Sequence, residues 1–299
     1  MALGIGAVLA LVGCIPPPPP AAVGPMTIGV HHTVGVRQLT FVDSTRGTDA
    51  FGSYPGSPSR RLPTTIWYPT DGGGPFPLVV FAHGYAVTPS FYASLLPRLA
   101  AAGYVVAAPT YPLLSGQPAG PTDTVGWHDL FADTWFVTSR MLDLSASGDP
   151  TFGGSIAADR IAVAGHSDGA AIAYGDGYQP FRLDARVRAV VAYAADLGAL
   201  GIYQPNGRPI LHVLSDNDEY DPYAEAISWD RAHLQAPKYT VTLRDATHAD
   251  PYTTPADPHF DLVTRVTIAF LDATLKAHPE AMDAATADIA AHPSLAAIE

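Results

Sequence analysis

The chain has 299 residues, enough for one large α/β domain and too few for two complete ones. Hydrophobic residues make up 47% and charged residues 15%, which supports a sizeable buried core and argues against extended disorder inside the chain. The formal net charge of -12 and the lack of any Lys- or Arg-rich run argue against a nucleic-acid partner.

The N-terminal stretch predicts an export signal. Residues 1–13 are apolar or small, too few for a transmembrane helix but typical of the hydrophobic part of a signal peptide. The sequence from Leu11 to Cys14 resembles a bacterial lipobox, in which the cysteine is lipidated and becomes the mature N-terminus. Cys14 is the only cysteine of the chain, so no intrachain disulfide can form.

The segment 14–30 is a proline-rich linker. Pro16 to Pro20 predict a stiff polyproline II segment that rises about 3 Å per residue and would hold a domain away from a membrane. We therefore expect an exported bacterial lipoprotein, at the cell surface or in the periplasm, whose membrane contact is the lipid on Cys14. No Lys or Arg precedes the apolar run, and an ordinary cleaved signal with a secreted product is the alternative.

One folded domain is expected over residues 31–278. Residues 34–46 and 60–70 are rich in β-formers and predict two strands that can pair as a hairpin. From residue 77 onward, short apolar runs alternate with segments of helical periodicity. The apolar runs predict strands at 77–85, 104–112, 160–167, 187–196, 208–218 and 238–248. The helical segments are 88–103, with a kink or a later start at Pro97, then 128–146, 168 onward, 223–233 and 260–278.

This alternation predicts an α/β fold, with a mainly parallel central sheet and helices on both faces. The run within 77–85 is apolar without a break, as expected for a strand buried on both faces. No insertion is long enough for a large lid domain, and the Ala-rich segment 279–299 is expected to be a peripheral tail. In such a sheet, functional side chains gather on loops at the carboxyl ends of the strands.

The stretch Gly165-His166-Ser167-Asp168-Gly169 matches G-x-S-x-G at the junction of an expected strand and an expected helix. A sharp turn at such a junction, a nucleophile elbow, pushes the serine hydroxyl out above the sheet. The glycines let backbone pass closely where a side chain would clash. Ser167 is therefore a candidate nucleophile, although the pentapeptide alone is a weak signal and needs partners elsewhere in the chain.

A serine hydroxyl is a poor nucleophile at neutral pH and needs an adjacent base that is oriented by a carboxylate. His248 ends the expected strand 238–248 and precedes a loop, which makes it the candidate base. Asp218 ends the strand 208–218 and is the preferred acid. One strand and one helix fit into each interval between these residues, so the three side chains can share one edge of the sheet.

Other residues compete for these roles. Asp216 and Asp221 are the second and third choices for the acid, and His259 is the second choice for the base. His166 is expected to point into the packing of the sheet. The acidic stretch 216–221 superficially resembles a calcium loop, but Asp221 stands where such a loop needs glycine. We therefore expect no metal and no other cofactor.

A carbonyl attacked by serine develops negative charge, which N–H donors stabilise. One donor is expected from the backbone of Asp168, the residue after the nucleophile, and the other from the backbone of Tyr85. Tyr85 follows Gly84 at a strand end, where glycine allows the chain to turn an N–H inward. Both side chains are also candidates for substrate binding. The ring of Tyr85 can line the pocket, and the carboxylate of Asp168 lines a subsite, caps the helix or points to solvent.

Taken together, these motifs resemble the α/β-hydrolase superfamily over about residues 34–277. The resemblance rests on RRLPTTIWYP, PFPLVVFAHGY, APTYPLLSG and DRIAVAGHSDGA, followed in order by Asp218 and His248. It is nearest to platelet-activating-factor-acetylhydrolase-like and dienelactone-hydrolase-like esterases, with cutinase-like polyester hydrolases nearby. It implies an α/β-hydrolase fold, a triad of Ser167, Asp218 and His248, the oxyanion hole described above, and two-step acyl transfer to water without a cofactor.

The resemblance leaves the substrate open. Dienelactone hydrolases carry a cysteine nucleophile, and cutinase-like polyester hydrolases usually carry an uncharged residue where Asp168 stands. We expect a monomeric serine hydrolase of carboxylic esters, carboxylesterase- or lipase-like, that acts on a small or lipid-like ester. The alternatives are a polyester hydrolase, a serine peptidase of the same fold, and a non-enzymatic surface-binding lipoprotein with a hydrolase fold.

Overall fold

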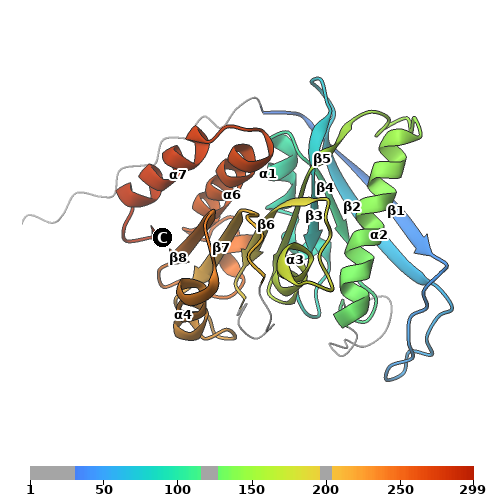
Figure 1. The fold of residues 1–299 in the computed structure, drawn as a ribbon, viewed down its shortest axis with the longest axis horizontal. Coiled ribbons are helices and arrows are strands. Elements are labelled where there is room, and N and C mark those ends of the chain that lie inside the picture. The colour runs from blue at the N-terminus through green and yellow to red at the C-terminus, as the bar shows by residue number, and fades with distance from the viewer. Residues whose placement is uncertain (1–30, 116–126, 196–203) are drawn as a thin grey trace, which may run out of the picture.

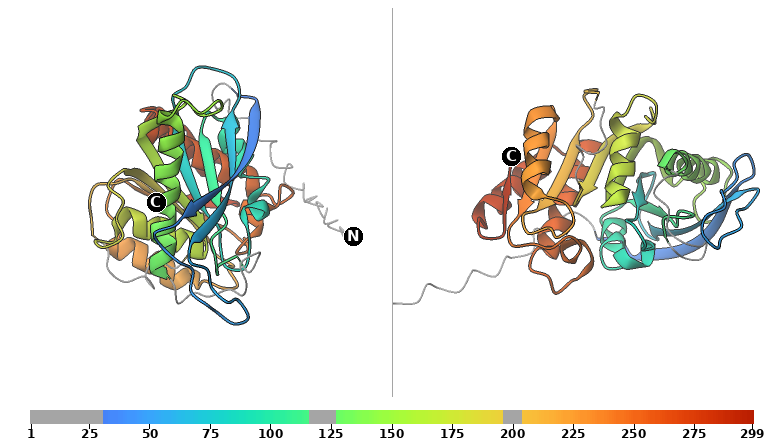
Figure 2. Two further views of the ribbon diagram at one scale, coloured as in Figure 1. Left: turned by 90° about the vertical axis from the view of Figure 1, so that its right-hand side faces the viewer. Right: turned by 90° about the horizontal axis from the view of Figure 1, so that it is seen from below.

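The computed structural model describes residues 31–115, 127–195 and 204–299. The predicted signal peptide, the proline-rich linker and Cys14 lie outside these ranges. The described residues form one sheet with helices packed on both faces, as Figures 1 and 2 show. No helix within these ranges combines the length and the apolar character needed to cross a membrane.

Within the described ranges the strands follow the order β1-β2-β4-β3-β5-β6-β7-β8-β9 across the sheet. Neighbouring strands from β4 to β8 pair in parallel, whereas β1 with β2, β2 with β4 and β8 with β9 pair antiparallel. The predicted mainly parallel sheet and the predicted hairpin of the first two strands are confirmed. The bounds are β1 Val34–Asp43, β2 Arg60–Pro69, β3 Phe76–Ala82, β4 Val105–Pro109, β5 Ile156–His166, β6 Val187–Tyr193, β7 Ile210–Ser215, β8 Lys238–Leu243 and β9 Ala296–Ile298.

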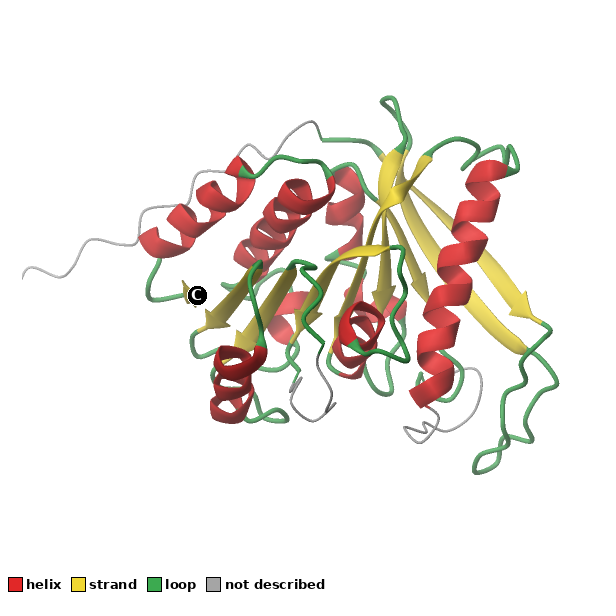
Figure 3. Ribbon diagram, viewed as in Figure 1, coloured by secondary structure: helices red, strands yellow, loops and turns green. Residues whose placement is uncertain are grey.

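The helices divide between the two faces of the sheet (Figures 1 and 3). Helices α1, α6 and α7 contribute to one apolar cluster, and α2 and α3 contribute to the other. Their bounds are η1 Pro89–Tyr92, α1 Leu96–Ala101, α2 Trp127–Ala146, α3 Asp168–Tyr178, α4 Tyr223–His233, α5 Asp250–Thr253, α6 Phe260–Leu275 and α7 Glu280–Ala291.

Strand β3 shows why the central strands are apolar without alternation. Val79 and Phe81 belong to the cluster under α1 and α6, while Leu78 and Val80 belong to the cluster under α2 and α3. Successive side chains of a strand point to opposite faces of its sheet, so a strand covered on both sides needs an apolar residue at every position. All four residues are fully buried.

The segment predicted as one helix over 88–103 consists of two short helices, η1 and α1. Pro97 lies in the first turn of α1. A proline is tolerated there because the first N–H groups of a helix have no acceptor within the helix. Of the two possibilities at Pro97, a kink or a helix that begins later, the structure has the later start, at Leu96.

The C-terminal segment differs from the peripheral tail expected for residues 279–299. It forms α7 and then β9, which pairs with β8 as the edge of the sheet. Met282, Ala285 and Ile289 of α7 are buried in the cluster that includes α6. These residues recur at helical spacing, so an apolar stripe is hidden within an Ala-rich composition.

Candidate active site

Ser167 lies between β5 and α3 with a strained backbone. Its φ of 57° and ψ of −127° fall outside the regions that residues with side chains usually occupy. Its backbone N–H donates to the carbonyl of Tyr193 at 2.9 Å, which ties the turn to the end of β6. The turn therefore carries the serine side chain beyond the carboxyl end of β5, which is the geometry of a nucleophile elbow.

The glycines around Ser167 serve close packing. A Cβ atom added to Gly165 would lie 2.0 Å from the carbonyl oxygen of Gly169. One added to Gly169 would lie 2.1 Å from the carbonyl oxygen of Ala82, at the end of β3. A Cβ on Gly84 would lie 3.2 Å from the Cβ of Ser167. The start of α3 thus crosses the ends of two strands with no room for a side chain.

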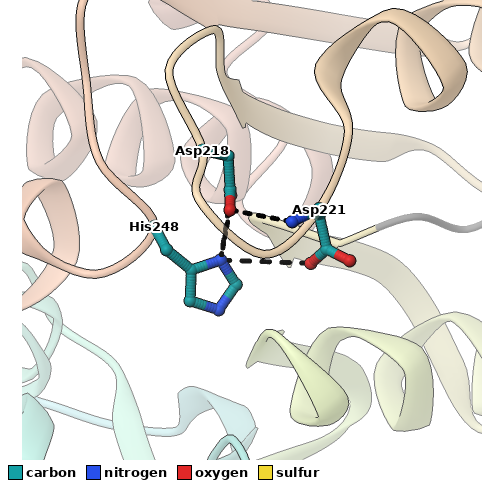
Figure 4. A group of neighbouring side chains, drawn as sticks. All are labelled: Asp218, Asp221 and His248. Carbon is teal, nitrogen blue, oxygen red and sulfur yellow. Dashed lines mark hydrogen bonds and ion pairs between the residues drawn. The ribbon is translucent and has the colours of Figure 1, made fainter.

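His248 follows β8 and Asp218 follows β7, and their side chains are in contact (Figure 4). The Nδ1–H of His248 donates to the Asp218 carboxylate, with distances of 2.9 and 3.0 Å to its two oxygens. The backbone N–H groups of Tyr220 and Asp221 also donate to Asp218, each at 2.9 Å. Glu219 accepts the backbone N–H of His248 at 3.0 Å, so the loop after β7 holds both the ring and the main chain of the histidine.

The two partners stabilise each other's charged forms. Burial lowers the pKa of His248, but the hydrogen bond and charge of Asp218, with smaller contributions from Asp221 and Glu219, outweigh it and leave the pKa above its ordinary value of 6.5. Burial raises the pKa of Asp218, but hydrogen bonds from His248 and from two backbone amides leave it below its ordinary value. With Nδ1–H bound to the carboxylate, Nε2 is the nitrogen of His248 that can take up a proton.

Four of the five predicted site residues line one cavity of about 740 Å³. They are Ser167, His248, Tyr85 and Asp168, and Asp218 lies behind His248. The described residues that line this cavity are Gly84, Tyr85, Val87, Phe91, Tyr92, His166, Ser167, Asp168, Ala171, Ala195, Glu219, Tyr220, Asp221, His248 and Ala249. The cavity wall combines apolar and aromatic groups with three carboxylates and carries no Lys or Arg among these residues.

The other candidates for the acid and the base contact His248 less closely than Asp218 or not at all. Asp216 accepts the backbone N–H of Asp245 at 2.6 Å, a bond between the loops after β7 and β8. Asp221 places a carboxylate oxygen 3.9 Å from Nδ1 of His248 and is a more distant neighbour than Asp218. His259 lies at the start of α6 against Asp257, at 2.9 Å, and does not line the cavity.

Asp218, Asp221 and His248 also form a group that could converge on a cation. The ligand atoms of these described residues lie within 4.8 Å of one another. The nitrogen of His248 that faces the carboxylates, Nδ1, already donates to Asp218, and a metal would have to displace its proton (Figure 4). The donor set therefore fits an oriented histidine base better than a metal centre.

The loop after β3 is fixed by a buried histidine. His83 donates from Nδ1 to the carbonyl of Gly84 at 2.8 Å and accepts the backbone N–H of Tyr111 at Nε2, at 3.0 Å. Burial lowers the pKa of His83 to about 4, so the ring is neutral at physiological pH. Because C=O and N–H point in opposite directions across a trans peptide, the N–H of Tyr85 points away from the His83 ring.

The side chain of Asp168 is partly buried in the cavity wall at the first position of α3. Burial raises the pKa of this carboxyl, and the neighbouring His248 lowers it by a smaller amount. A carboxylate at a helix N-terminus is favoured by the helix dipole. Lining the pocket and capping the helix, two of the roles that the sequence allowed for Asp168, are therefore compatible with its position.

Two residues of the cavity wall have polar contacts that the sequence did not reveal. Tyr92, at the end of η1, is fully buried and contacts His166 through a hydrogen bond of 2.9 Å. His166 is buried as expected, but its ring also contacts the main chain of His248. The position of His166 beside Ser167 was the one available hint, and nothing in the sequence pointed to Tyr92.

Comparisons with known proteins agree with the fold described above. The family model for chlorophyllase matches residues 45–193, which include the elbow at Ser167. A solved structure of a ferulic acid esterase from Streptomyces cinnamoneus superposes with a TM-score of 0.61 at 20% sequence identity, over 82% of this chain and 91% of that one. The chain has the α/β-hydrolase fold. A search of curated protein sequences found no match.

Both comparisons agree with the carboxylic-ester hydrolase that the sequence predicts. The non-enzymatic alternative does not agree with these comparisons. The matching solved structures number 1245 chains, and a fold so widely used leaves the substrate undetermined. The substrate and the catalytic roles must therefore be argued from the site.

Proposed function

We propose that the chain hydrolyses carboxylic esters through a covalent acyl-enzyme on Ser167. Nε2 of His248 takes the proton of the serine hydroxyl while Oγ attacks the ester carbonyl. The tetrahedral intermediate then expels the alcohol, which leaves with the proton from Nε2. A water molecule, deprotonated by the same nitrogen, attacks the acyl-enzyme and releases the carboxylic acid, which restores Ser167.

The observation that carries the proposal is the Asp218–His248 pair beside the elbow. The carboxylate is bound to Nδ1 at 2.9 Å, which leaves Nε2 as the basic nitrogen. His248 and Ser167 line the same cavity although they are far apart in the sequence. The imidazolium formed in the transition state is stabilised by Asp218, whose ionised form is favoured by three hydrogen bonds from described groups.

Two backbone N–H groups are the proposed donors for the oxyanion. The N–H of Asp168 belongs to the first turn of α3, where N–H groups have no acceptor within the helix. The N–H of Tyr85 points away from His83, whose ring holds the carbonyl of the same peptide. Donors of this kind stabilise the transition state by a factor of about 10² to 10³ each.

The charge of the cavity wall supports neutral esters as substrates. Asp168, Glu219 and Asp221 line the cavity with no described Lys or Arg among its residues. Anionic acyl groups would therefore be repelled, and the carboxylate product would be driven out after hydrolysis. We propose that Asp168 limits the pocket to short or polar acyl groups.

Kinetics with a graded ester series test the proposal. Wild-type protein is expected to hydrolyse 4-nitrophenyl acetate and butyrate, with lower kcat/KM for decanoate and for a succinate half-ester. Ser167→Ala should remove the activity without lowering the Tm. Turnover confined to peptide amides would contradict the ester assignment, and hydrolysis of polyester films at rates comparable to those for small esters would favour a polyester hydrolase.

We also propose that the enzyme is exported and anchored through a lipid on Cys14. The proposal rests on the sequence from Leu11 to Cys14 and on the proline-rich linker. Mass spectrometry of the mature N-terminus from a bacterial host should show a diacylglyceryl cysteine at Cys14. Cys14→Ala should release the protein from the membrane fraction, and an unmodified N-terminus beyond Cys14 would contradict the anchor.

A further inference from the structure

Two buried side chains that take no part in the acyl-transfer steps connect the loops of the site. Tyr92 Oη lies 3.1 Å from the backbone nitrogen of Gly84 and 2.9 Å from Nδ1 of His166. Nε2 of His166 lies 2.8 Å from the carbonyl oxygen of His248. The contacts form a continuous chain from the loop after β3 to the loop after β8.

The direction of every hydrogen bond in this chain is determined. The carbonyl of His248 can only accept, so Nε2 of His166 carries the proton. Burial, with a smaller effect of His248, lowers the pKa of His166 to about 3, so its ring is neutral and Nδ1 is an acceptor. Tyr92 O–H therefore donates to Nδ1, and its oxygen accepts the N–H of Gly84.

This series of hydrogen bonds reaches each part of the proposed site. Gly84 precedes Tyr85, a proposed oxyanion donor. His166 immediately precedes Ser167, and His248 is the proposed base. From these contacts we infer that Tyr92 and His166 are positioning residues that fix the oxyanion loop, the nucleophile and the base relative to one another. The inference rests on the proposed function of Ser167 and His248.

Aromatic packing holds both rings independently of their hydrogen bonds. The Tyr92 ring lies 4.7 Å from Phe81 between centroids, and the His166 ring lies 5.1 Å from Tyr252. A variant that removes only the polar atoms should therefore keep the packing and lose the hydrogen-bond chain. Tyr92→Phe is such a variant, since it removes the acceptor for Gly84 and the donor to His166.

The matched control is Tyr104→Phe. Tyr104 is also fully buried, and its hydroxyl donates to Asp272 at 2.6 Å. It lies just before β4, at the amino end of that strand, whereas the site lies at the carboxyl ends of the strands. Both variants lose one buried phenolic hydroxyl group and its hydrogen bonds, so both are expected to lose stability. Only Tyr92→Phe should also misplace the catalytic groups, and only this variant should therefore turn over substrate more slowly in each correctly folded molecule.

The measurement is kcat per active site, counted by stoichiometric fluorophosphonate labelling, on 4-nitrophenyl butyrate well below the Tm. Tyr92→Phe should lower kcat per labelled site by about 10- to 100-fold with KM within threefold, because displacements of about 1 Å cost rates of this order. Tyr104→Phe should stay within twofold of wild type. Equal rates per site for Tyr92→Phe and wild type, or equal losses in both variants, would overturn the inference.

Two substitutions at His166 test its hydrogen bonds to Tyr92 and to His248 separately. His166→Gln keeps an N–H near the position of Nε2, whereas His166→Asn keeps a polar atom near Nδ1 and loses the bond to His248. We expect His166→Gln to retain at least fivefold more kcat per labelled site than His166→Asn. The reverse order would overturn the inference. If wild-type protein is not labelled at Ser167, the proposed function itself fails, and that result is distinct from a labelled, fully active Tyr92→Phe.

Discussion

Replacing Asp218 with Asn tests the orienting acid most severely. Asn has the same shape but no charge, and its amide can hold His248 in the wrong tautomer. The carboxylate lies 2.9 Å from Nδ1 and its side chain is 2% exposed, so solvent screens the pair little. Unit charges at this distance interact by about 6 kcal/mol at an effective dielectric constant of about 20. A 10⁴-fold rate loss corresponds to about 5.4 kcal/mol, so we expect kcat/KM to fall by about 10⁴-fold.

The pH dependence provides a second measure of the same substitution. His248 must be neutral to accept the serine proton, so activity rises as the pH passes above its pKa. The wild-type acid limb of kcat/KM should therefore lie above pH 6.5, because Asp218 and its neighbours raise this pKa. In Asp218→Asn the limb should move to lower pH, since the largest charge that favours the imidazolium is gone.

The neighbouring aspartates supply matched controls for this experiment. Asp216→Asn should leave kcat/KM within twofold, because Asp216 bonds the backbone of Asp245 and not His248. Asp221→Asn should cost about 10-fold or less, because its carboxylate is 3.9 Å from Nδ1. Stopped-flow or steady-state kinetics on 4-nitrophenyl butyrate would measure all three. The assignment of Asp218 would be refuted if Asp218→Asn kept more than a tenth of wild-type kcat/KM. It would also be refuted if Asp221→Asn lost more kcat/KM than Asp218→Asn.

Three further predictions concern the elbow, the pocket and the C-terminal segment. Gly165→Ala and Gly169→Ala should each prevent soluble folding or abolish esterase activity, because the new Cβ would overlap a carbonyl oxygen, whereas Gly73→Ala meets nothing within 4 Å and should behave as wild type. Asp168→Met should raise kcat/KM for decanoate relative to acetate, and an unchanged chain-length profile would assign the carboxylate to helix capping alone. Ile289→Ala should lower the free energy of unfolding by about 2 to 4 kcal/mol in urea titration, and a loss below 0.5 kcal/mol would mean that α7 adds little to the core.

Much of the fold could be predicted because strands that are buried on both faces have unbroken apolar sequences. The run at Leu78 to Ala82 is apolar at every position, and a parallel sheet brings the ends of such strands to one edge. That topology brings Ser167 and His248 to one cavity although they are distant in sequence. The match to G-x-S-x-G indicated a nucleophile elbow because a strand was predicted before it and a helix after it. The structure contains both elements.

What the sequence could not predict depends on loop conformation and on side chains that meet only after folding. Asp216, Asp218 and Asp221 stand close together in sequence, and the turn that presents Asp218 to His248 decides between them. The hydrogen bond from Tyr92 to His166 joins η1 to the end of β5, and no local pattern marks it. The burial of α7 was missed because its alanines suggested a tail, while the three buried positions of the helix set its packing face.

Intact-mass analysis with a fluorophosphonate tests the central claim most directly. Wild-type protein should gain the mass of one phosphonyl group, and peptide mapping should place it on Ser167. Ser167→Ala should gain none, and Asp218→Asn should react at a much lower rate although its serine is intact. A label on another residue, or an unchanged label in Ser167→Ala, would contradict the assignment of Ser167 as the nucleophile.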